Sequence, residues 1–436
     1  MEQIETRTLR KATARLLPLL ALCYFVAFLD RVNVGFAALT MNKDLGLSAS
    51  SFGLGAGLFF LTYIVFEVPS NLLLQRVGAR RWIARIMLTW GLVSAGMAFI
   101  SGETGFYVLR ALLGVAEAGF FPGVLFFLKG WFPRSHRSRV VAYFMAAIPL
   151  ASVVGAPISG FILGLDGWLG MAGWKWLFIL EAVPALILAV VLLTRLPDSP
   201  ASVPWLADDE RAWLAKRLEQ ERQADEAATR DAPGGTLGLR VVAMGLIYFG
   251  TTATNYALGF WLPQIVKGFG LSNAQTGLVS AIPFVVGLIS MIVWGIGADR
   301  RGGAKMHLAA TLVIAITGLL GSALVDSLTM KLVALSFGSI GIYAALPTFW
   351  GLSIRARSPA GVAAGIAAIG SIGSFSGFAV PYVVGLVKDA TGSFSWGLVA
   401  IAAFAGMSLL VLVFLPDGGE AREIAPALPG QRVGSA

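Results

Sequence analysis

Ionisable residues stand inside long apolar stretches of this sequence. The stretch YVLRALLGVAEAGFFPG holds Arg110 and Glu117, and the stretch FLDRVNVGF holds Asp30 and Arg31. The spacing of Arg110 and Glu117 is about two helical turns, so they are expected on one helix face, roughly 10 Å apart. A charge near the bilayer centre costs at least about 2.5–3.5 kcal/mol, so such residues face a partner or a wet cavity. The pattern predicts an anion and proton site, and bracing of helices by buried charges is the alternative.

Arginine and carboxylic acids have complementary roles in such a site. An arginine stays charged at physiological pH and its planar fork matches a carboxylate, so Arg31 or Arg110 is the expected anchor for an anionic substrate. Apolar surroundings favour the protonated form of an acid, and a nearby guanidinium favours the ionised form. A substrate that engages the arginine therefore releases the acid to take a proton. On this reasoning Asp30 and Glu117 are the candidate proton-coupling residues.

Other polar and aromatic residues of the apolar stretches extend the candidate site. Tyr63 stands one turn before Glu67, and Glu181 is a further acid; the sequence assigns no role to these two glutamates. Several residues of the second half suit the orientation of hydroxyls or stacking on a flat group. They are Asn255, Tyr256, Trp350, Ser371 and Ser374. For Trp350 and the serines, interfacial anchoring and close helix packing are the alternatives.

Composition places the chain in a membrane. It has 436 residues, of which 57% are hydrophobic and only 13% charged, a balance that no soluble domain of this length can hide from water. The net charge of +9 could suggest nucleic acid, but the basic residues lie between apolar runs, so no nucleic-acid partner is expected. The single cysteine, Cys23, excludes an intrachain disulfide. The first apolar run contains charges and is expected to remain as a membrane span.

Apolar windows of about 20 residues predict twelve membrane-spanning helices and therefore an all-α fold. The spans are expected at 16–38, 51–74, 82–100, 105–128, 139–165, 174–194, 239–266, 275–297, 305–324, 329–352, 360–387 and 394–415. The composition changes between spans six and seven. The predicted parts are an N-terminal six-helix half at 1–196, a cytoplasmic linker at 197–238, a C-terminal six-helix half at 239–416 and a cytoplasmic tail at 417–436.

The distribution of basic residues predicts the orientation. Loops that follow odd-numbered spans are poor in Lys and Arg, whereas the N-terminal segment and the other loops are rich in them, as at 76–85 and 129–139. The positive-inside rule then places both termini and the linker in the cytoplasm. The expected location is the inner, or plasma, membrane, with the lipid bilayer around the spans.

The linker is expected to contain one short amphipathic helix. The run DDERAWLAKRLEQERQADE can be capped by Asp208, with Trp213, Leu214 and Leu218 in one apolar stripe. Such a helix would lie on the membrane surface, or the segment would be a solvated linker.

The two groups of six spans carry signs of an internal duplication. Gly78 and Gly302 are separated by the same number of residues as Pro157 and Pro381. Two six-helix halves related by parallel pseudo-symmetry form a rocker-type secondary transporter, whose substrate site lies at the membrane midplane between the halves.

The sequence offers no sign of an enzyme. The Gly-rich stretch at 365–377 lacks the lysine of a phosphate loop and sits in an apolar span. His136 and His307 lie in basic loops, and no nucleophile, base and orienting group form a catalytic set. We therefore expect no catalytic activity, no cofactor and no metal.

Several long motifs connect the chain to a known family. They are FLDRVNVGFAAL, EVPSNLLLQRVGARRWIARI, FYVLRALLGVAEAGFFPGVLFFLKGWFP, GWKWLFILEAVPA and KDATGSFSWGL. Over nearly its full length the chain resembles the major facilitator superfamily and, within it, the anion:cation symporters, which include the bacterial tartrate and 4-hydroxyphenylacetate permeases. The resemblance implies the major facilitator fold.

The resemblance also implies which residues carry proton coupling and substrate binding. They are Asp30, Arg31, Arg110 and Glu117, with Tyr63 and Trp350 in the substrate site. Two positions depart from the pattern of the sugar-acid symporters. The tyrosine two residues before the span-one acid is Phe28 here, and the asparagines common in span eleven are replaced by Gly370 and Ser374. Fewer polar partners favour a less hydroxylated acid than a sugar acid.

The superfamily's loop motif implies a conformational latch. The motif is intact in the second half and degenerate in the first, where Asn71 and Gln75 replace its Gly and Asp. The implied gating residues are Arg76 and Gly78 in the first copy and Gly295, Asp299, Arg300 and Gly302 in the second.

The residues and the resemblance together predict a transporter that acts as a monomer. It is expected to import a small organic carboxylate by proton symport through alternating access, and a tartrate-like acid, a sugar acid or an aromatic acid is the expected substrate. Anion exchange and sodium coupling are the alternatives within transport. A membrane sensor that binds the same acid without transporting it is the alternative outside transport.

Overall fold

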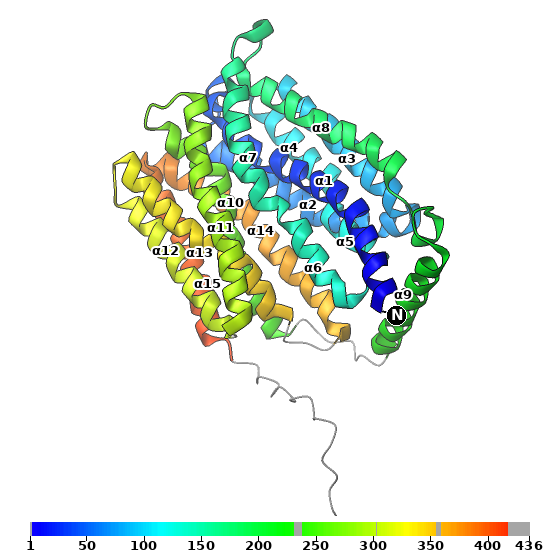
Figure 1. The fold of residues 1–436 in the computed structure, drawn as a ribbon. Coiled ribbons are helices and arrows are strands. Elements are labelled where there is room, and N and C mark those ends of the chain that lie inside the picture. The colour runs from blue at the N-terminus through cyan, green and yellow to red at the C-terminus, as the bar shows by residue number, and fades with distance from the viewer. Residues whose placement is uncertain (1, 231–237, 302, 355–358, 417–436) are drawn as a thin grey trace, which may run out of the picture.

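The computed structural model describes residues 2–230, 238–301, 303–354 and 359–416 (Figure 1). Within them, twelve helical segments are long and apolar enough to cross a membrane, so the prediction of an all-α protein with twelve spans is confirmed. Long helices follow from the sequence because apolar runs of this length can satisfy their backbone groups inside a bilayer only as helices or closed barrels.

The helices fall into an N-terminal group, a linker helix and a C-terminal group. The N-terminal group comprises α1 (Glu2–Leu45), α2 (Ala49–Val77), α3 (Ala79–Gly96), α4 (Gly102–Glu117), α5 (Phe120–Lys129), α6 (Arg134–Met145), α7 (Ala147–Ile162) and α8 (Gly173–Arg195). The linker helix is α9 (Asp208–Arg230). The C-terminal group comprises α10 (Leu239–Lys267), α11 (Asn273–Arg301), α12 (Ala304–Ala323), α13 (Leu328–Ile354), α14 (Pro359–Thr391) and α15 (Phe394–Phe414).

The bundle has two ends, which we name by their contents. The basic end carries the start of α1, the helix α9 and the arginine-rich turn between α2 and α3 (Figure 1). The distal end is the opposite one and carries the turns at 46–48, 163–172, 268–272 and 391–393. Most spans run between these ends without interruption.

Three predicted spans differ from the helices found. The first helix begins at Glu2, well before the predicted start at residue 16. Predicted span four is two helices, α4 and α5, and predicted span five is likewise divided into α6 and α7. The division of span four directly follows Glu117, the last residue of α4.

The early start of α1 is explained by its contacts with the linker. Arg7 Nε donates to Glu210 Oε1 at 2.6 Å and Lys11 Nζ donates to Glu210 Oε2 at 2.8 Å. The Glu210 carboxyl also accepts the N–H of Ala207, so it, rather than Asp208, closes the first turn of α9. Burial works against ionisation here, but the bonds from Lys11, Ala207 and Arg7 prevail and hold the pKa of Glu210 below its usual range. The first turns of α1 are therefore held as helix by the linker.

The apolar stripe of α9 packs on protein in the structure. Leu214 is fully buried, and Trp213 and Leu218 pack partly buried against the main core. The helix is present, its stripe faces the protein core, and α9 contacts both α1 and α14.

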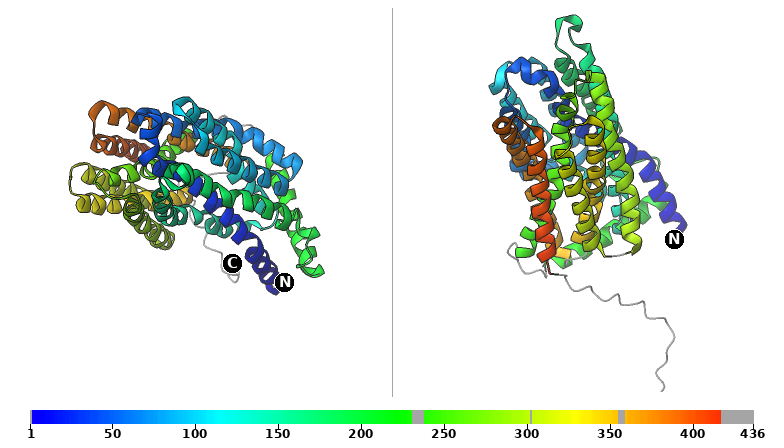
Figure 2. Two further views of the ribbon diagram at one scale, coloured as in Figure 1. Left: turned by 90° about the horizontal axis from the view of Figure 1, so that it is seen from above. Right: turned by 90° about the vertical axis from the view of Figure 1, so that its left-hand side faces the viewer.

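Backbones of the two groups of helices come into close contact toward the distal end. A Cβ atom added to Gly53 of α2 would lie 2.2 Å from the carbonyl oxygen of Pro381 on α14, and one added to Gly160 of α7 would lie 2.7 Å from that of Asn273 on α11. Figure 2 shows α14 (orange) beside the early helices (blue), in agreement with the contacts of α2 and α14. Only glycine permits such close approach of two backbones.

A carboxylate bridges the same seam. Asp389 of α14 accepts the backbone N–H groups of Ala49 and Ser50, at 3.1 and 2.8 Å. These groups belong to the first turn of α2, whose N–H groups have no partner within the helix and whose dipole favours a negative charge. The C-terminal group therefore closes the start of α2 at the distal end.

Candidate functional site

Arg31 and Glu117 form an ion pair between two helices of the N-terminal group. Arg31 comes from α1 and Glu117 from the last turn of α4, and the Arg31 Nη2 group donates to Glu117 Oε1. The Glu117 side chain is fully buried and that of Arg31 is 11% exposed. The second oxygen, Glu117 Oε2, has no hydrogen-bond partner among the described residues. The pair thus joins a predicted substrate anchor to a predicted proton-coupling acid.

Aromatic rings surround the Arg31 guanidinium. Its Cζ atom lies 5.3 Å from the ring centre of Phe59, 5.6 Å from that of Tyr63, 5.8 Å from that of Phe28 and 6.0 Å from that of Phe60. Such faces attract a cation without using its N–H groups. The rings therefore hold the guanidinium in place while its donors stay available to a carboxylate.

Asp30 points away from this pair, toward α3. Trp90 Nε1 donates to Asp30 Oδ2 at 2.8 Å, Ser94 Oγ donates to Asp30 Oδ1, and Asn33 Nδ2 reaches the same oxygen at 3.4 Å. Asp30 is 2% exposed. Neighbouring residues of a helix point about 100° apart, which explains why Asp30 contacts α3 while Arg31 contacts α4. Sequence reasoning did not single out Trp90 and Ser94, which a polar spacing within span three could have indicated.

Arg110 is the most deeply buried guanidinium of the site. It is fully buried, its Nη2 donates to the carbonyl oxygen of Ala56 at 3.1 Å, and its Cζ lies 5.1 Å from the Phe59 ring centre. Nε and Nη1 have no hydrogen-bond partner within the described part of the chain. Asp30 and Glu117 are the acids that act on it electrostatically. A buried charge with open donors is expensive and is expected where function requires it.

The membrane span that carries Arg110 and Glu117 is broken directly after the acid. Ala118 leaves the helical region with ψ 131°, and Gly119 has φ 87°, which glycine adopts without strain. The freed carbonyl of Ala118 accepts from Ser70 Oγ at 2.6 Å, and Ser70 Oγ in turn accepts from Trp82 Nε1 at 3.0 Å. Irregular backbone at membrane depth is tolerated only where protein or a cavity satisfies it. The sequence AGFFPG carried this signal, but the predicted span ran through it.

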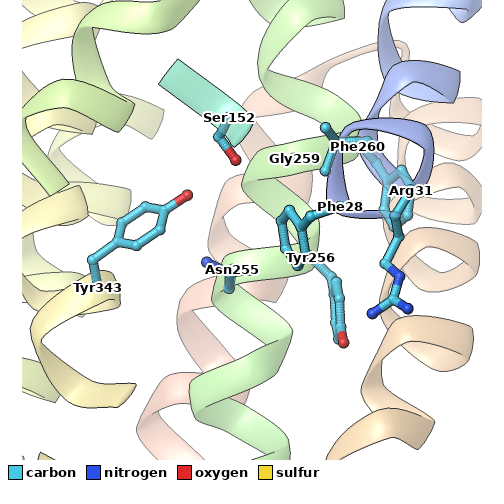
Figure 3. Close-up of a pocket in the computed structure, with 9 residues that line it drawn as sticks. Phe28, Arg31, Ser152, Asn255, Tyr256, Gly259, Phe260 and Tyr343 are labelled. Carbon is cyan, nitrogen blue, oxygen red and sulfur yellow. The ribbon is translucent and has the colours of Figure 1, made fainter. Parts of the chain in front are cut away.

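The C-terminal group contributes Asn255 and Tyr256 to a small cavity beside Arg31. The cavity measures about 10 Å³, room for about one water molecule. Its lining consists of Phe28, Arg31, Val32, Ser152, Asn255, Tyr256, Gly259, Phe260 and Tyr343. In Figure 3 the hydroxyl groups of Ser152 and Tyr343 point toward one another on one side of Asn255. Sequence reasoning missed Ser152 and Tyr343, because nothing in one sequence shows that α7 and α13 meet there.

Arg31 and Tyr256 face the same way in this cavity. In Figure 3 the guanidinium and the phenol hydroxyl both point away from Gly259 and Phe260, which lie nearer the distal end of α10. The Tyr256 ring centre lies 4.5 Å from that of Phe60. The polar ends of these two side chains are therefore directed toward the basic end.

The structure does not bring every predicted site residue to this place. Trp350 packs on Tyr248, with ring centres 5.1 Å apart, and on Phe349 at 5.4 Å. Ser371 and Ser374 lie half-buried on α14. The described lining of the cavity contains none of these three residues, and their place in the substrate site stays a prediction.

The predicted gating residues are only partly described. Arg76 is exposed in the last turn of α2, and Gly78, with φ 93°, ends that helix. Gly295 lies half-buried on α11. The side chains of Asp299 and Arg300, and all of Gly302, lie outside the described residues. The latch therefore stays a prediction.

The charges of the site suit an organic anion better than a metal. Two guanidinium groups, of Arg31 and Arg110, lie with the acids Asp30 and Glu117, and each acid is bound by hydrogen-bond donors. Across the described ranges, no group of three or more His, Cys, Asp or Glu side chains could hold a metal ion. Exchange of carboxylates on an arginine is the chemistry this arrangement can perform.

Comparisons with known proteins extend these observations. The profile described as Major Facilitator Superfamily matches residues 20–381. A protein of Agrobacterium vitis named "Putative tartrate transporter" is 49% identical over 420 residues, which cover 95% of this chain and 97% of that protein. NicT of Pseudomonas putida, named "Putative metabolite transport protein", is 41% identical over 413 residues, with 93% and 94% covered.

A likeness to a solved structure bears on the fold alone. The crystal structure of a bacterial homologue of the human lysosomal transporter Spinster, inward-facing and occupied, gives a TM-score of 0.75 at 16% identity. The match covers 92% of this chain and 96% of that chain.

A bundle of twelve apolar spans with buried arginines and acids near the meeting of its two groups is the architecture of a secondary transporter. The chain belongs to the Major Facilitator Superfamily, and the predicted fold and family are confirmed. It is a multi-pass membrane transporter and not an enzyme.

Proposed function

We propose that this transporter carries a small organic carboxylate together with a proton, by alternating access. The observation that supports the proposal is the Arg31–Glu117 pair, in which a substrate carboxylate can take the place of the Glu117 carboxylate on the same guanidinium. The name of the Agrobacterium vitis relative also favours a carboxylate substrate.

Competition for Arg31 couples substrate to proton. An ionised Glu117 occupies the guanidinium, and a proton on Glu117 removes that competitor and leaves the N–H groups free for the substrate. Binding without the proton would leave the buried Glu117 charge without a partner, which is costly in a site of low polarity. Substrate and proton therefore bind together in the most stable loaded state.

Alternating access requires that the closed seam can move. In this conformation Asp389 and the glycine contacts close the distal end, while Arg31 and Tyr256 are directed toward the basic end. Under the positive-inside rule the basic end is cytoplasmic, so the polar ends of Arg31 and Tyr256 are directed toward the cytoplasm in this conformation. The cavity that Arg31 lines measures about 10 Å³, so a carboxylate that binds to Arg31 at this place requires the surrounding helices to separate.

Uptake by the purified protein in proteoliposomes tests this function. We expect at least one of radiolabelled tartrate, a sugar acid and an aromatic acid to accumulate above its external concentration when the outside is acidic, and a protonophore to abolish the accumulation. A sodium gradient without a pH gradient serves as the matched control. Accumulation driven by sodium alone, or uptake that needs a preloaded internal anion, would contradict proton symport. Binding with no uptake under any gradient would favour a sensor.

Accessibility of introduced cysteines tests the proposed orientation. The single native cysteine, Cys23, is buried, so new cysteines at exposed positions can be labelled selectively. We expect a membrane-impermeant thiol reagent to label a cysteine at Lys43, near the distal end, in intact cells. A cysteine at Lys216 on α9 should react only after the membrane is opened. Labelling of position 216 in sealed cells would reverse the orientation.

A further inference from the structure

Glu181 is a buried acid that the proposed mechanism does not use. It lies on α8, is 3% exposed, and accepts a hydrogen bond from Ser159 Oγ of α7 at 2.8 Å through its Oε1 atom. Its second oxygen, Oε2, has no hydrogen-bond partner within the described ranges. A buried carboxyl oxygen without a donor is costly, so the residue needs an explanation.

Asn33 connects Glu181 to Asp30. The Asn33 side chain is fully buried, its Nδ2 reaches Asp30 Oδ1 at 3.4 Å, and it also interacts with the Glu181 carboxyl. Its Oδ1 atom, like Glu181 Oε2, lacks a hydrogen-bond partner in the described part of the chain. The three side chains thus contain two buried oxygen atoms, Glu181 Oε2 and Asn33 Oδ1, that accept no hydrogen bond from a described residue. One proton on Glu181 would supply the missing donor.

The charged groups around the cluster also favour a proton on Glu181. Arg110 acts on Asp30, and Arg31 is paired with Glu117, so each of these acids has a cation. The ionisable group that acts on Glu181 is Asp30, another acid, and the other groups around the cluster, from α3 and α7, are the neutral Trp90, Ser94 and Ser159. A buried carboxylate with no cation is far more costly than a neutral carboxyl group.

We propose that Glu181 is a further proton-binding residue of this transporter and that Asp30, Asn33 and Glu181 form a unit that holds one proton. In this conformation the proton is on Glu181, which donates to Asn33 Oδ1, while Asn33 Nδ2 donates to ionised Asp30. When the Asn33 amide turns over, it fits the converse arrangement, with the proton on Asp30 and the charge on Glu181. Both arrangements contain one proton and one negative charge, so Asp30 can become neutral while the three side chains keep their hydrogen bonds.

The role of Glu181 in transport rests on the proposed proton coupling. The first test does not depend on that coupling, because it detects the proton on Glu181 itself. The infrared spectrum of the purified wild-type protein at neutral pH is expected to contain a protonated-carboxyl C=O band component that is absent from Glu181→Gln. The exposed acid Asp326 provides the matched control, because Asp326→Asn makes the same chemical change away from the unit. A spectrum that Glu181→Gln leaves unchanged would overturn the proposal, whether or not the protein proves to be a symporter.

The second test asks whether the proton matters to transport. A negative charge on Glu181 strengthens the binding of a proton to Asp30. Glutamine carries no such charge, so in Glu181→Gln the pH midpoint of proton-driven uptake should move to lower pH by about one unit or more. Asp326→Asn should retain the wild-type profile. Glu181→Gln should also melt close to wild type, because glutamine mimics the protonated acid. An unchanged pH profile, or a variant that cannot fold, would contradict the proposal. Absence of proton-driven uptake in the wild type would instead contradict the proposed function.

Discussion

Replacing Arg31 with alanine is expected to weaken binding of the carboxylate substrate by about 30-fold or more. Truncating one partner of a buried charge pair costs about 2–5 kcal/mol, and about 1.4 kcal/mol is a factor of ten in affinity. Arg31→Lys should lose less, because it keeps the charge but not the planar fork that a carboxylate engages with two hydrogen bonds. Titration of the detergent-purified variants with the substrate found in the uptake screen measures both effects.

The fold of the Arg31 variants has to be controlled, because Arg31→Ala leaves the Glu117 carboxylate buried without its partner. The double variant Arg31→Ala with Glu117→Gln removes that orphan charge and should recover thermal stability while it still fails to bind. Arg81, an exposed arginine at the basic end, supplies a matched charge removal that should leave affinity unchanged. Wild-type affinity in the stable double variant would move the anchor to Arg110 or elsewhere.

The twelve spans could be predicted because membrane insertion depends mainly on local composition. A long apolar run has no alternative to a helix in lipid, so windows of sequence were sufficient. The start of α1 could not be predicted in this way. Its first turns are polar, and they are helical because Arg7 and Lys11 bind Glu210, a residue far away in the sequence. Tertiary contacts of this kind leave no periodic signal in the segment itself.

The site shows the same division between local and long-range information. Helical spacing correctly placed Arg110 and Glu117 on one helix, but the break after Glu117 depends on Ser70 of α2, which satisfies the freed carbonyl of Ala118. The sequence likewise did not show which acid pairs with which arginine. Either acid could have paired with either arginine, and in the structure Arg31 of α1 pairs with Glu117 of α4. Predicting which residues pair between helices requires a structure, because the pairing depends on packing angles that one sequence does not encode in an obvious pattern.

Exchanging Glu117 for glutamine is expected to separate binding from proton coupling. The amide cannot carry the negative charge that competes for Arg31, so substrate affinity should equal or exceed that of the wild type and should lose its dependence on pH. The amide also cannot release a proton, so uphill accumulation should fall to equilibration while exchange of labelled for unlabelled substrate persists. Proteoliposomes with and without an imposed pH gradient measure the two properties on one preparation.

Asp30→Asn should also abolish accumulation, but for a different structural reason. Asp30 binds Trp90 and Ser94 and acts on Arg110, so its neutral form leaves the buried Arg110 charge with one acid fewer. We therefore expect Asp30→Asn to slow exchange as well, because it also loses the bonds to Trp90 and Ser94, whereas Glu117→Gln keeps exchange. Both variants should lose some thermal stability, because Glu117→Gln also leaves Arg31 and Arg110 with one acid fewer. If the two acids only neutralise the arginines for folding, both variants should lose stability and every mode of transport together. Accumulation at the wild-type level in both variants would exclude Asp30 and Glu117 as the proton-coupling residues.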